Sequence, residues 1–531
     1  MVLPQTEQIT AYQKVLVIDL GSQYTQLIAR KIREQNVYCE IMPYSEVTVE
    51  IIKRKLPIAL VLSGGPASVY KTDAPKLADE IFSLGIPILG ICYGMQLGCQ
   101  ALGGNVISGS EIGAGGEFGR TELCIEHNDI FFENVGKSGE KTTVWMSHRD
   151  RVENPGEQFI HLASTPSCPY AAVKHKKYPF YGIQFHTEVN HTIKGRELLR
   201  NFLFNVCKAK GDWLMTSFIE TTVEELQRLV KADERVIVGL SGGVDSSVVT
   251  ALLYRALGDR VSCIYVDNGL MREGENAIVK EMFGKHFKTD LHIVNAGERF
   301  LTKLAGITDP EQKRIIIGHE FIRVFEDEAR KIKNAKFLAQ GTLYPDVIES
   351  VPAHGGPTAT IKRHHNVGGL PDKFDFQLIE PLRHLFKDEV RVMGTALGLP
   401  EELVWRQPFP GPGLAVRIIG DVTHEKCVLL RKADTIVLQE IRAANLYRKV
   451  WQAFAVLLPV KSVGVMGDER TYENIASIRI VESVDAMTAD WARVPYEVLD
   501  RIARRIINEV RGFNRVVYDI SSKPPATIEY E

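Results

Sequence analysis

The sequence predicts an α/β protein with two consecutive open, mostly parallel sheets, followed by a small α+β module. Through residues 14–405, short apolar runs typical of buried strands alternate with patterns typical of helices, which indicates parallel βα units. After the stiff Pro- and Gly-rich stretch RQPFPGPGLAVR (406–417), the order changes to helix, strands and helix. The 531 residues suffice for several cores, and we expect domains at 14–207, 208–405 and 406–531.

The first domain is expected to begin with alternating strands and helices and to end in more strand-like sequence. Strand patterns lie at 15–20, 58–64 and 86–91, and the helical pattern YTQLIARKIREQ (24–35) follows the first of them. The later segments TTVWMSHRD and VKHKKYPFYGIQFH are typical of strands. A helical pattern at 195–207 closes the domain.

The second domain follows a polar break, KAKGDW (208–213), which we interpret as a linker. Its expected elements are a helix at 217–230 and strands at 235–240, 261–266, 290–294 and within 337–348. Residues 350–373 are rich in Gly, Pro and His, and we interpret this long loop as a lid, with a plain surface loop as the alternative. Residues 418–531 then alternate helix and strand, as in a small α+β module.

Composition and charge limit the partners. The hydrophobic fraction is 45%, and the formal net charge of −2 gives no global attraction to nucleic acid or to an anionic membrane. The sequence shows no apolar run of membrane-spanning length and no signal-peptide pattern. The eight cysteines form no CxxC pair, and the pair His364–His365 has no zinc-site spacing. We expect a cytoplasmic protein with neither nucleic-acid nor membrane partners.

The most informative stretch is RVIVGLSGGVDSS (235–247), in which a strand pattern is followed by a Gly-rich turn and a helix. Such a loop presents backbone N–H groups and a helix N-terminus to an anion. No Gly-Lys-Ser/Thr follows, which excludes the P-loop of kinases and GTPases. The stretch resembles the PP-loop of enzymes that split ATP into AMP and pyrophosphate; a plain structural turn is the alternative. The resemblance implies ATP-binding residues at Ser241, Gly242, Gly243, Val244, Asp245, Ser246 and Ser247.

A second candidate site surrounds Cys92. The sequence Gly90-Ile91-Cys92-Tyr93-Gly94 follows a strand pattern and precedes a helical one, as in a nucleophile elbow with Cys in place of Ser. A nucleophilic thiol needs a base and a group that orients the base. His186 and Glu188 supply both, and in an extended segment they point to the same side.

Other residues of this site are weaker candidates. Backbone N–H groups at Gly64, Gly65 and Tyr93 are candidates for an oxyanion hole. Gln96 and the segment Ser147-His148 are candidates for binding the substrate. Cys99 is expected to be a core residue, and GAGGEFG (113–119) is expected to be a loop.

The motifs SGGP, GICYGMQ and GIQFHTE together resemble the class I glutamine amidotransferase domain over residues 15–205. Thr187 stands where that family usually has Pro, which leaves the triad side chains in place. The resemblance implies that Cys92 is the nucleophile, that His186 is the base and acid, and that Glu188 orients it.

Taken as a whole, the chain resembles the GMP synthetase family. The match is carried by SGGVDSS, HHNVGGLP, EPLRHLFKDEVR, QPFPGPGLAVR, VGVMGDER and SKPPATIEYE. This resemblance implies an amidotransferase domain, an adenine-nucleotide α-hydrolase-like PP-loop domain and a C-terminal dimerisation module. It also implies a ligase that converts XMP to GMP, with glutamine and ATP consumed and AMP, pyrophosphate and glutamate released.

The same resemblance implies residues near the nucleotides. Those expected near XMP are Arg314, Asp468, Arg470, Lys523, Ile528 and Glu529. Lys387 and Glu389 are expected near the ATP phosphates or the attacked oxygen, and Asp245 is a candidate ligand for Mg²⁺. For each lone charge, a solvated surface residue is the alternative. Tyr530 stands where Trp is typical and keeps an aromatic face.

Three other functions remain open at this point. A PP-loop enzyme acting on tRNA usually needs paired cysteines or a basic surface, and the sequence shows neither. A glutamine-dependent ligase with another acceptor would be separated by acceptor screening. A binding protein without activity is disfavoured by the intact triad and PP-loop residues.

Overall fold

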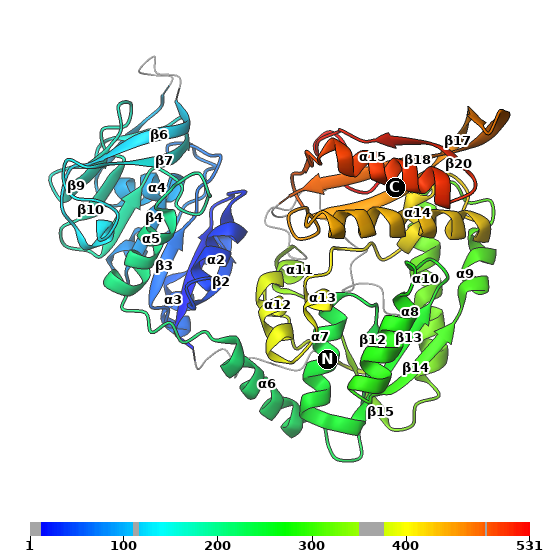
Figure 1. Cartoon of the computed structure of the whole chain (residues 1–531). Helices are drawn as coiled ribbons and strands as arrows, with labels where there is room; N and C mark the ends of the chain where they lie inside the picture. Colours follow the sequence, from blue (N-terminus) through cyan, green and yellow to red (C-terminus); the bar gives the residue numbers. More distant parts are fainter. Residues whose placement is uncertain (1–11, 110–115, 350–375, 484–485) are drawn as a thin grey trace. The chain divides into compact units, whose positions relative to one another are not determined.

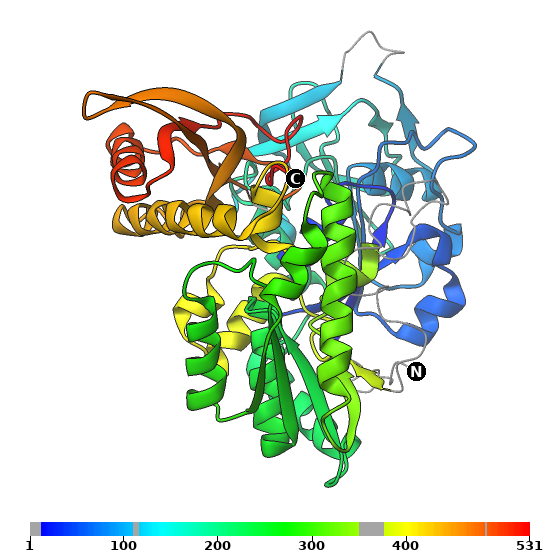
Figure 2. The ribbon, with the colours of Figure 1, turned by 90° about the vertical axis from the view of Figure 1, so that its right-hand side faces the viewer.

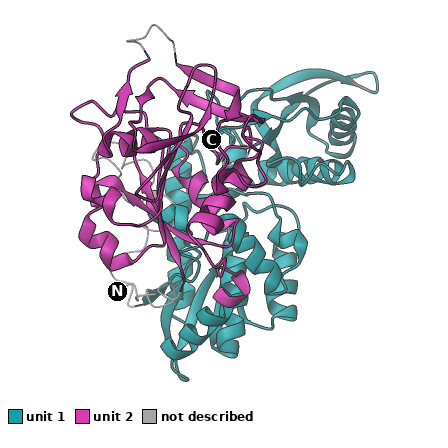
Figure 3. Cartoon of the chain, turned by 90° about the vertical axis from the view of Figure 1, so that its left-hand side faces the viewer, with its two compact units in different colours: residues 1–3, 219–347, 360–531 teal, residues 4–218, 348–359 magenta. Residues whose placement is uncertain are grey.

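The computed structural model describes residues 12–109, 116–349, 376–483 and 486–531 (Figure 1). The chain divides into two compact units (Figure 3). The amino-terminal unit holds the described residues up to 218 together with 348–349, and the carboxy-terminal unit those at 219–347 and from 376 onward. The lid predicted at 350–373, which includes His364–His365, lies outside the described residues.

The amino-terminal unit is built on a nine-stranded sheet that is parallel in one half and antiparallel in the other. The parallel half has the order β2 (Tyr38–Pro43), β1 (Lys14–Asp19), β3 (Ala59–Leu62), β4 (Ile88–Ile91) and β11 (Phe180–Ile183). The antiparallel half continues with β10 (Ala172–His175), β9 (Phe159–Ser164), β6 (Glu117–Ile125) and β7 (Lys141–His148). β5 (Asn105–Ile107) and β8 (Arg151–Asn154) form a separate pair.

The inner strands of this sheet are apolar because both of their faces are buried. β3 and β4 have no exposed residue, as the predicted strand patterns require. The helices are α2 (Thr25–Arg33), α3 (Val49–Lys55), α4 (Tyr93–Ala101) and α5 (Gly195–Arg200), which continues as a π-helical turn over Asn201–Val206. The expectation of a loop at 113–119 is wrong for Glu117–Gly119, which begin β6.

The carboxy-terminal unit contains an all-parallel five-stranded sheet, seen edge-on among the green elements of Figure 2. Its order is β14 (Asp290–Asn295), β13 (Val261–Asp267), β12 (Arg235–Leu240), β15 (Ala335–Ala339) and β16 (Gln377–Ile379). Its helices are α7 (Val244–Leu257), α8 (Glu275–Val279), α9 (Gly297–Leu304), α10 (Pro310–Ala329), α11 (Tyr344–Glu349), α12 (Lys387–Ala396) and α13 (Glu401–Val404). Helix α8 continues as a π-helical turn over Lys280–His286. The strand pattern read within 337–348 ends at Ala339, and after residues 340–343 the chain forms a helix over Tyr344–Glu349.

The same unit continues into an α+β module, which confirms the predicted fold class. The module holds α14 (His424–Ala443), β17 (Gln452–Met466), β18 (Glu469–Glu482), β19 (Asp490–Trp491), α15 (Tyr496–Glu509) and β20 (Phe513–Tyr518). β17 and β18 form a long antiparallel ribbon whose turn, Gly467-Asp468, has two positive φ angles (57° and 66°), the geometry of a tight hairpin turn.

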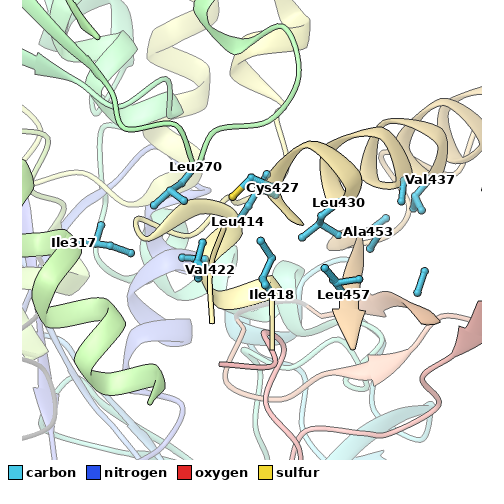
Figure 4. Packing of buried hydrophobic residues seen from close by; sticks show 14 of the residues in the cluster. Leu270, Ile317, Leu414, Ile418, Val422, Cys427, Leu430, Val437, Ala453 and Leu457 are labelled. Carbon is cyan, nitrogen blue, oxygen red and sulfur yellow. The ribbon is translucent and has the colours of Figure 1, made fainter. Parts of the chain in front are cut away.

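One hydrophobic cluster joins the parallel sheet to this module (Figure 4). Leu270 follows β13 and Ile317 lies on α10, and both belong to the same buried cluster as Leu414, Cys427 and Leu430. Gly413 permits the close approach, because a Cβ there would lie 2.4 Å from the Leu270 carbonyl oxygen. Within the described ranges, none of the helices combines the length and apolar character that a membrane crossing requires.

The segment expected to be a polar linker is anchored by Trp213. Its ring is 2% exposed and lies 4.8 Å from the Tyr38 ring and 5.3 Å from the Phe218 ring. The buried Arg33 guanidinium stacks 4.7 Å from the Trp213 ring, and the Trp213 N–H donates to the Asn36 carbonyl. The chain thus stays fixed on the amino-terminal unit up to the start of α6 (Met215–Leu229).

We expect Trp213→Ala to lower the free energy of unfolding of the amino-terminal unit by about 3–5 kcal/mol, because it empties a large buried site. The neighbouring Leu214→Ala is the matched control: its side chain is 44% exposed, so its effect should stay within about 0.5 kcal/mol. Urea unfolding followed by circular dichroism measures both. Equal effects of the two substitutions would contradict the anchoring role.

Candidate functional sites

Cys92 lies at a sharp turn between β4 and α4. Its backbone has φ 52° and ψ −105°, a strained conformation for a residue with a side chain. A Cβ on Gly90 would lie 2.5 Å from the Gly94 carbonyl oxygen, and one on Gly94 would lie 2.5 Å from the Leu62 carbonyl oxygen. The two glycines are therefore required by the elbow, which presents the thiol beside the helix N-terminus.

His186 and Glu188 meet beside Cys92, although not on a strand as predicted, since β11 ends at Ile183. His186 Nδ1 lies 2.7 Å from Glu188 Oε1, and both side chains are buried. Burial alone would lower the pKa of His186, but the Glu188 carboxylate and the hydrogen bond with the Cys92 side chain raise this pKa well above its ordinary value. The three side chains thus have the connectivity of a nucleophile, a base and an orienting carboxylate.

The glycines expected to form an oxyanion hole lie against this pair. A Cβ on Gly64 would lie 3.4 Å from His186 Cε1 and 3.7 Å from Cys92 Cβ. In the described part of the chain, no acceptor is found for the backbone N–H of Gly65 or of Tyr93. These N–H groups are thus available to a substrate oxygen near the thiol.

Two glutamines pack next to the sulfur, and only one was a sequence candidate. Gln96 Nε2 donates to the Asp150 carbonyl (2.8 Å) and to Gln184 Oε1 (3.2 Å). Gln184 Nε2 in turn lies 3.5 Å from Cys92 Sγ, and the Ser147 carbonyl lies 3.8 Å from the same sulfur. Sequence reasoning assigned no role to Gln184, although it stands within the GIQFHTE motif.

The candidate His148 and the expected core residue Cys99 lie in other surroundings. His148 points its Nδ1 to the Asp150 carbonyl (3.0 Å) and its Nε2 to Glu117 Oε2 (3.4 Å). Cys99 is fully buried in the core, where desolvation raises the pKa of its thiol. Cys99 is therefore the core residue that the sequence indicated.

The SGGVDSS loop connects β12 to α7 as predicted. Gly242 has φ 73°, a conformation that favours glycine. The hydroxyl of Ser246 lies 3.0 Å from that of Ser241, and Ser247 donates to the Gly243 carbonyl (2.8 Å), so the loop is closed on itself. The amino end of α7, from Val244 on, follows directly, and a helix N-terminus of this kind is suited to an anion.

Lys387 is brought to this loop from α12. Its Nζ lies 2.5 Å from Asp245 Oδ1 and 2.6 Å from Oδ2. Glu389 instead accepts from the Phe386 backbone N–H (2.8 Å) and so caps α12. A residue that the sequence did not single out, Arg406, donates to the Gly242 carbonyl (2.9 Å) and pairs with Glu275.

Asp245 fits a magnesium ion that arrives with a nucleotide rather than a resident metal. No group of three or more metal-binding side chains occurs among the described residues. Mg²⁺ in nucleotide sites is typically held by one or two carboxylates together with phosphate oxygens. The single half-buried carboxylate of Asp245, now paired with a cation, matches that requirement.

The predicted XMP residues fall into two places. Arg314 on α10 donates to the main-chain oxygen of Glu531, which brings it to the segment that carries Lys523, Ile528 and Glu529. Glu529 is held by the fully buried Arg417 through two contacts, at 3.0 and 2.9 Å. Neither Arg417 nor the fully buried Lys313, which donates to the Ile418 carbonyl (2.8 Å), was a sequence candidate.

Ile528 and Lys523 are partly committed to the fold. Ile528 is 8% exposed and packs with Phe454 and Val481. Lys523 donates from Nζ to the Ala486 carbonyl (2.8 Å), and its backbone pairs with Ala489.

Asp468 and Arg470 lie elsewhere, at the tip of the β17–β18 ribbon, which projects from the module in Figures 1 and 2. Both residues are exposed. Among the described residues, no hydrogen bond or ion pair joins either of them to Arg314 or to the segment 523–531.

Comparisons with known proteins match all three parts of the chain. Residues 16–206 match the family described as Glutamine amidotransferase class-I, residues 215–302 that described as NAD synthase, and residues 439–530 that described as GMP synthase C terminal domain.

Curated relatives align over nearly the whole length. Proteins named GMP synthase (glutamine-hydrolyzing) from Brachyspira hyodysenteriae and Clostridium novyi are 57% and 54% identical over 518 and 517 residues. A third of that name, from Clostridium botulinum, is 53% identical over 517 residues. The alignments cover 98%, 97% and 97% of this chain, in that order, and 99% of each relative. The chain belongs to the family of glutamine-hydrolysing GMP synthases.

Proposed function

We propose that this protein is a carbon–nitrogen ligase that makes GMP from XMP, ATP and glutamine. The observation that carries the proposal is the presence in one chain of a Cys–His–Glu constellation and an SGGVDSS loop at a helix N-terminus, within a sequence 57% identical to a relative named for this reaction. The proposed division of labour is amidotransferase at 14–207, ATP pyrophosphatase at 208–405 and nucleotide-contacting module at 406–531.

The glutamine half-reaction follows from the Cys92 geometry. The Cys92 thiolate attacks the carboxamide carbon, and the oxyanion accepts from the N–H groups of Gly65 and Tyr93. The C–N bond then breaks, and His186 gives its proton to the leaving nitrogen, which departs as ammonia. Water attacks the resulting thioester while His186 takes its proton, and glutamate is released. Glu188 keeps the imidazole ring oriented and stabilises its charged form.

Gln96 is a candidate contact for the substrate in this half-reaction. Its amide nitrogen is used by Asp150 and Gln184, but in the described part of the chain no donor is found for its Oε1. That oxygen is suited to accept from the ammonium group of the glutamine substrate.

The ATP half-reaction uses the loop and its neighbours. Phosphate oxygens would accept from the backbone N–H groups of the loop and of Val244, while Ser241, Ser246 and Ser247 donate hydroxyl protons. Lys387 would leave Asp245 for the phosphates, and Asp245 would then hold the Mg²⁺ that neutralises the pyrophosphate leaving group. The 2-oxo oxygen of XMP attacks the α-phosphorus, pyrophosphate leaves, and ammonia then displaces AMP from C2 to give GMP.

We also propose that the enzyme works as a homodimer through its C-terminal module. The ribbon carries Val463 and Tyr472 as cross-strand partners, 44% and 63% exposed, and Val465 on the same face is 75% exposed. Such an apolar face needs a cover. A second copy fits, because it would let the exposed Asp468 and Arg470 at the ribbon tip complete the XMP site of the other chain.

A cytoplasmic location is the remaining part of the proposal. All eight cysteines of the chain lie in the described ranges, and each of them is a free thiol. That pattern is typical of a reducing compartment.

Product analysis with two variants tests the division of labour. With XMP, ATP, Mg²⁺ and glutamine, we expect GMP, AMP and pyrophosphate in equal amounts. Cys92→Ala should abolish the glutamine-dependent reaction and retain the reaction with ammonia, because only the thiol is lost. Asp245→Ala should lower both reactions about 100-fold, because it acts at the shared ATP step. Loss of the ammonia reaction in a folded Cys92→Ala would refute the two-site assignment.

The pH profile of glutamine hydrolysis tests the role of Glu188. Replacing the carboxylate in Glu188→Gln removes the charge that raises the pKa of His186, so the imidazolium form is lost at lower pH. We expect the alkaline limb of kcat/KM to move to lower pH and turnover to fall by about 100-fold. An alkaline limb that stays in place would show that Glu188 does not act on the charge of His186.

Co-expression of two variants tests the shared XMP site. Arg314→Glu and Arg470→Glu should each be inactive as homodimers, because each lacks one half of the site. Together they should recover about a quarter of the parent activity, since half of the random dimers are mixed and one of their two sites is intact. Recovery is measured as ammonia-dependent GMP formation, and each variant co-expressed with itself is the control. Absence of recovery in dimers proven by light scattering would contradict the shared site.

A further inference from the structure

Gln184 lies against the sulfur of Cys92, the proposed nucleophile. Its side chain is fully buried, and its Nε2 lies 3.5 Å from Cys92 Sγ. Its Oε1 accepts from Gln96 Nε2 at 3.2 Å. Because Gln96 Nε2 is a donor only, Gln184 has to turn its oxygen toward Gln96 and its N–H₂ group toward the sulfur.

Gln96 is itself fixed, so the orientation of the Gln184 amide is built into the fold. Gln96 Nε2 also donates to the Asp150 carbonyl, at 2.8 Å. The chain of hydrogen bonds runs from the turn after β7 through α4 to the segment after β11. All three side chains of this chain, Cys92, Gln96 and Gln184, are at most 6% exposed. A buried amide that lacked these partners would be costly, which favours a single arrangement.

The sulfur therefore faces different partners in its two protonation states. A thiol S–H can donate to the Ser147 carbonyl, which lies 3.8 Å away. A thiolate cannot use that acceptor and needs donors instead. Because His186 Nδ1 faces Glu188, the ring can donate to the sulfur from Nε2 only while it is protonated, whereas the amide of Gln184 donates at every pH.

We propose that Gln184 is a further catalytic residue of glutamine hydrolysis, and that its amide N–H stabilises the Cys92 thiolate before attack and when the thioester is released. This role rests on the proposed function of Cys92 as the nucleophile. Hydrogen bonds to a charged acceptor are about twice as strong as those between neutral groups, so the amide favours the thiolate over the thiol. Gln96 acts through Gln184 and is a positioning residue in this respect.

Other titratable groups act on the same sulfur and have to be separated from this effect. His186 and Glu188 lie on the segment after β11, and Tyr93 is the next residue on α4. Cys168 interacts electrostatically with Cys92, and burial raises the pKa of its thiol to about 12, so it stays neutral across the range of a pH profile. The substitutions below leave all four groups in place.

The test measures the reactivity of Cys92 itself, as the rate of its alkylation by iodoacetamide across pH, read by mass spectrometry of the Cys92 peptide. In Gln184→Leu the thiolate loses its uncharged donor, so the apparent pKa of alkylation should rise by about one unit and the rate below that pKa should fall about tenfold. Gln184→Glu places a carboxylate at the same point and should raise the apparent pKa further. A packing role alone would not produce this order.

Matched variants keep the result interpretable. Gln158→Leu removes another glutamine of the same unit, whose Nε2 donates to the Leu102 carbonyl (2.7 Å), and it should leave the alkylation profile as in the parent. Should Gln184→Leu not fold, Gln184→Met gives an unbranched side chain of similar length without an N–H donor. Urea unfolding followed by circular dichroism shows whether the amino-terminal unit of each variant is folded.

The outcomes separate this proposal from the one on which it rests. A parent-like alkylation profile in folded Gln184→Leu or Gln184→Met overturns the role of Gln184, whatever Cys92→Ala does. Glutamine hydrolysis that persists in Cys92→Ala overturns the nucleophile assignment, whatever the alkylation profile shows. A raised apparent pKa together with slower glutamine hydrolysis supports the proposal.

Discussion

The close backbone approach at the start of α4 is the constraint on which the amino-terminal site depends. Gly94 lies so near β3 that a Cβ there would be 2.5 Å from a carbonyl oxygen, and the adjacent Cys92 has a positive φ. Two hydrogen bonds hold the strained turn: the Cys92 N–H donates to Ile183 at the end of β11, and the Gly94 N–H to Ser63 after β3. The strands on either side of β4 thus fix the turn, and the segments that follow them carry His186 and the Gly64-Gly65 pair. The order of the strands in the sheet therefore decides which residues surround Cys92.

In the carboxy-terminal unit, too, the candidate site follows the end of a buried strand, and buried charged side chains lie near it. Its PP-loop follows the central strand β12, at the edge where the carboxyl ends of parallel strands meet. The C-terminal module is tied to that edge by Arg431, which donates to the Met271 carbonyl, and by the ion pair of Arg272 with Asp434, 2.9 Å apart and almost fully buried. Buried pairs of this kind are weak sources of stability but costly to break from one side, so they fix where the module sits relative to the loop.

The sequence was most informative where local chemistry decides the structure. The β-branched runs of β1, β12 and β13 and the Gly-containing elbows follow from short-range rules, and they were predicted within about two residues. Trp213 was misread because its polar neighbours dominate the local pattern, while its burial depends on Arg33 and Tyr38 far earlier in the chain. Gln184 was missed because an amide becomes a catalytic candidate only when its partners are known. The pairing of Lys387 with Asp245, 142 residues apart, is likewise invisible to periodicity.

With ATP bound as proposed, the contact of Lys387 with Asp245 makes nucleotide entry an exchange of ions. Without ligand the two side chains neutralise each other, so the loop is not left with an uncompensated carboxylate. A triphosphate without metal could bind the lysine only by leaving the aspartate unpaired. A cation without nucleotide could bind the aspartate only by leaving the lysine unpaired. A metal–nucleotide complex satisfies both side chains at once. Every ligand that separates Lys387 from Asp245 therefore binds more weakly by the free energy of breaking that ion pair. Only the metal–nucleotide complex compensates this cost fully, because it gives both side chains a new partner. The ion pair thus favours the metal–nucleotide complex over the free nucleotide and over the free cation.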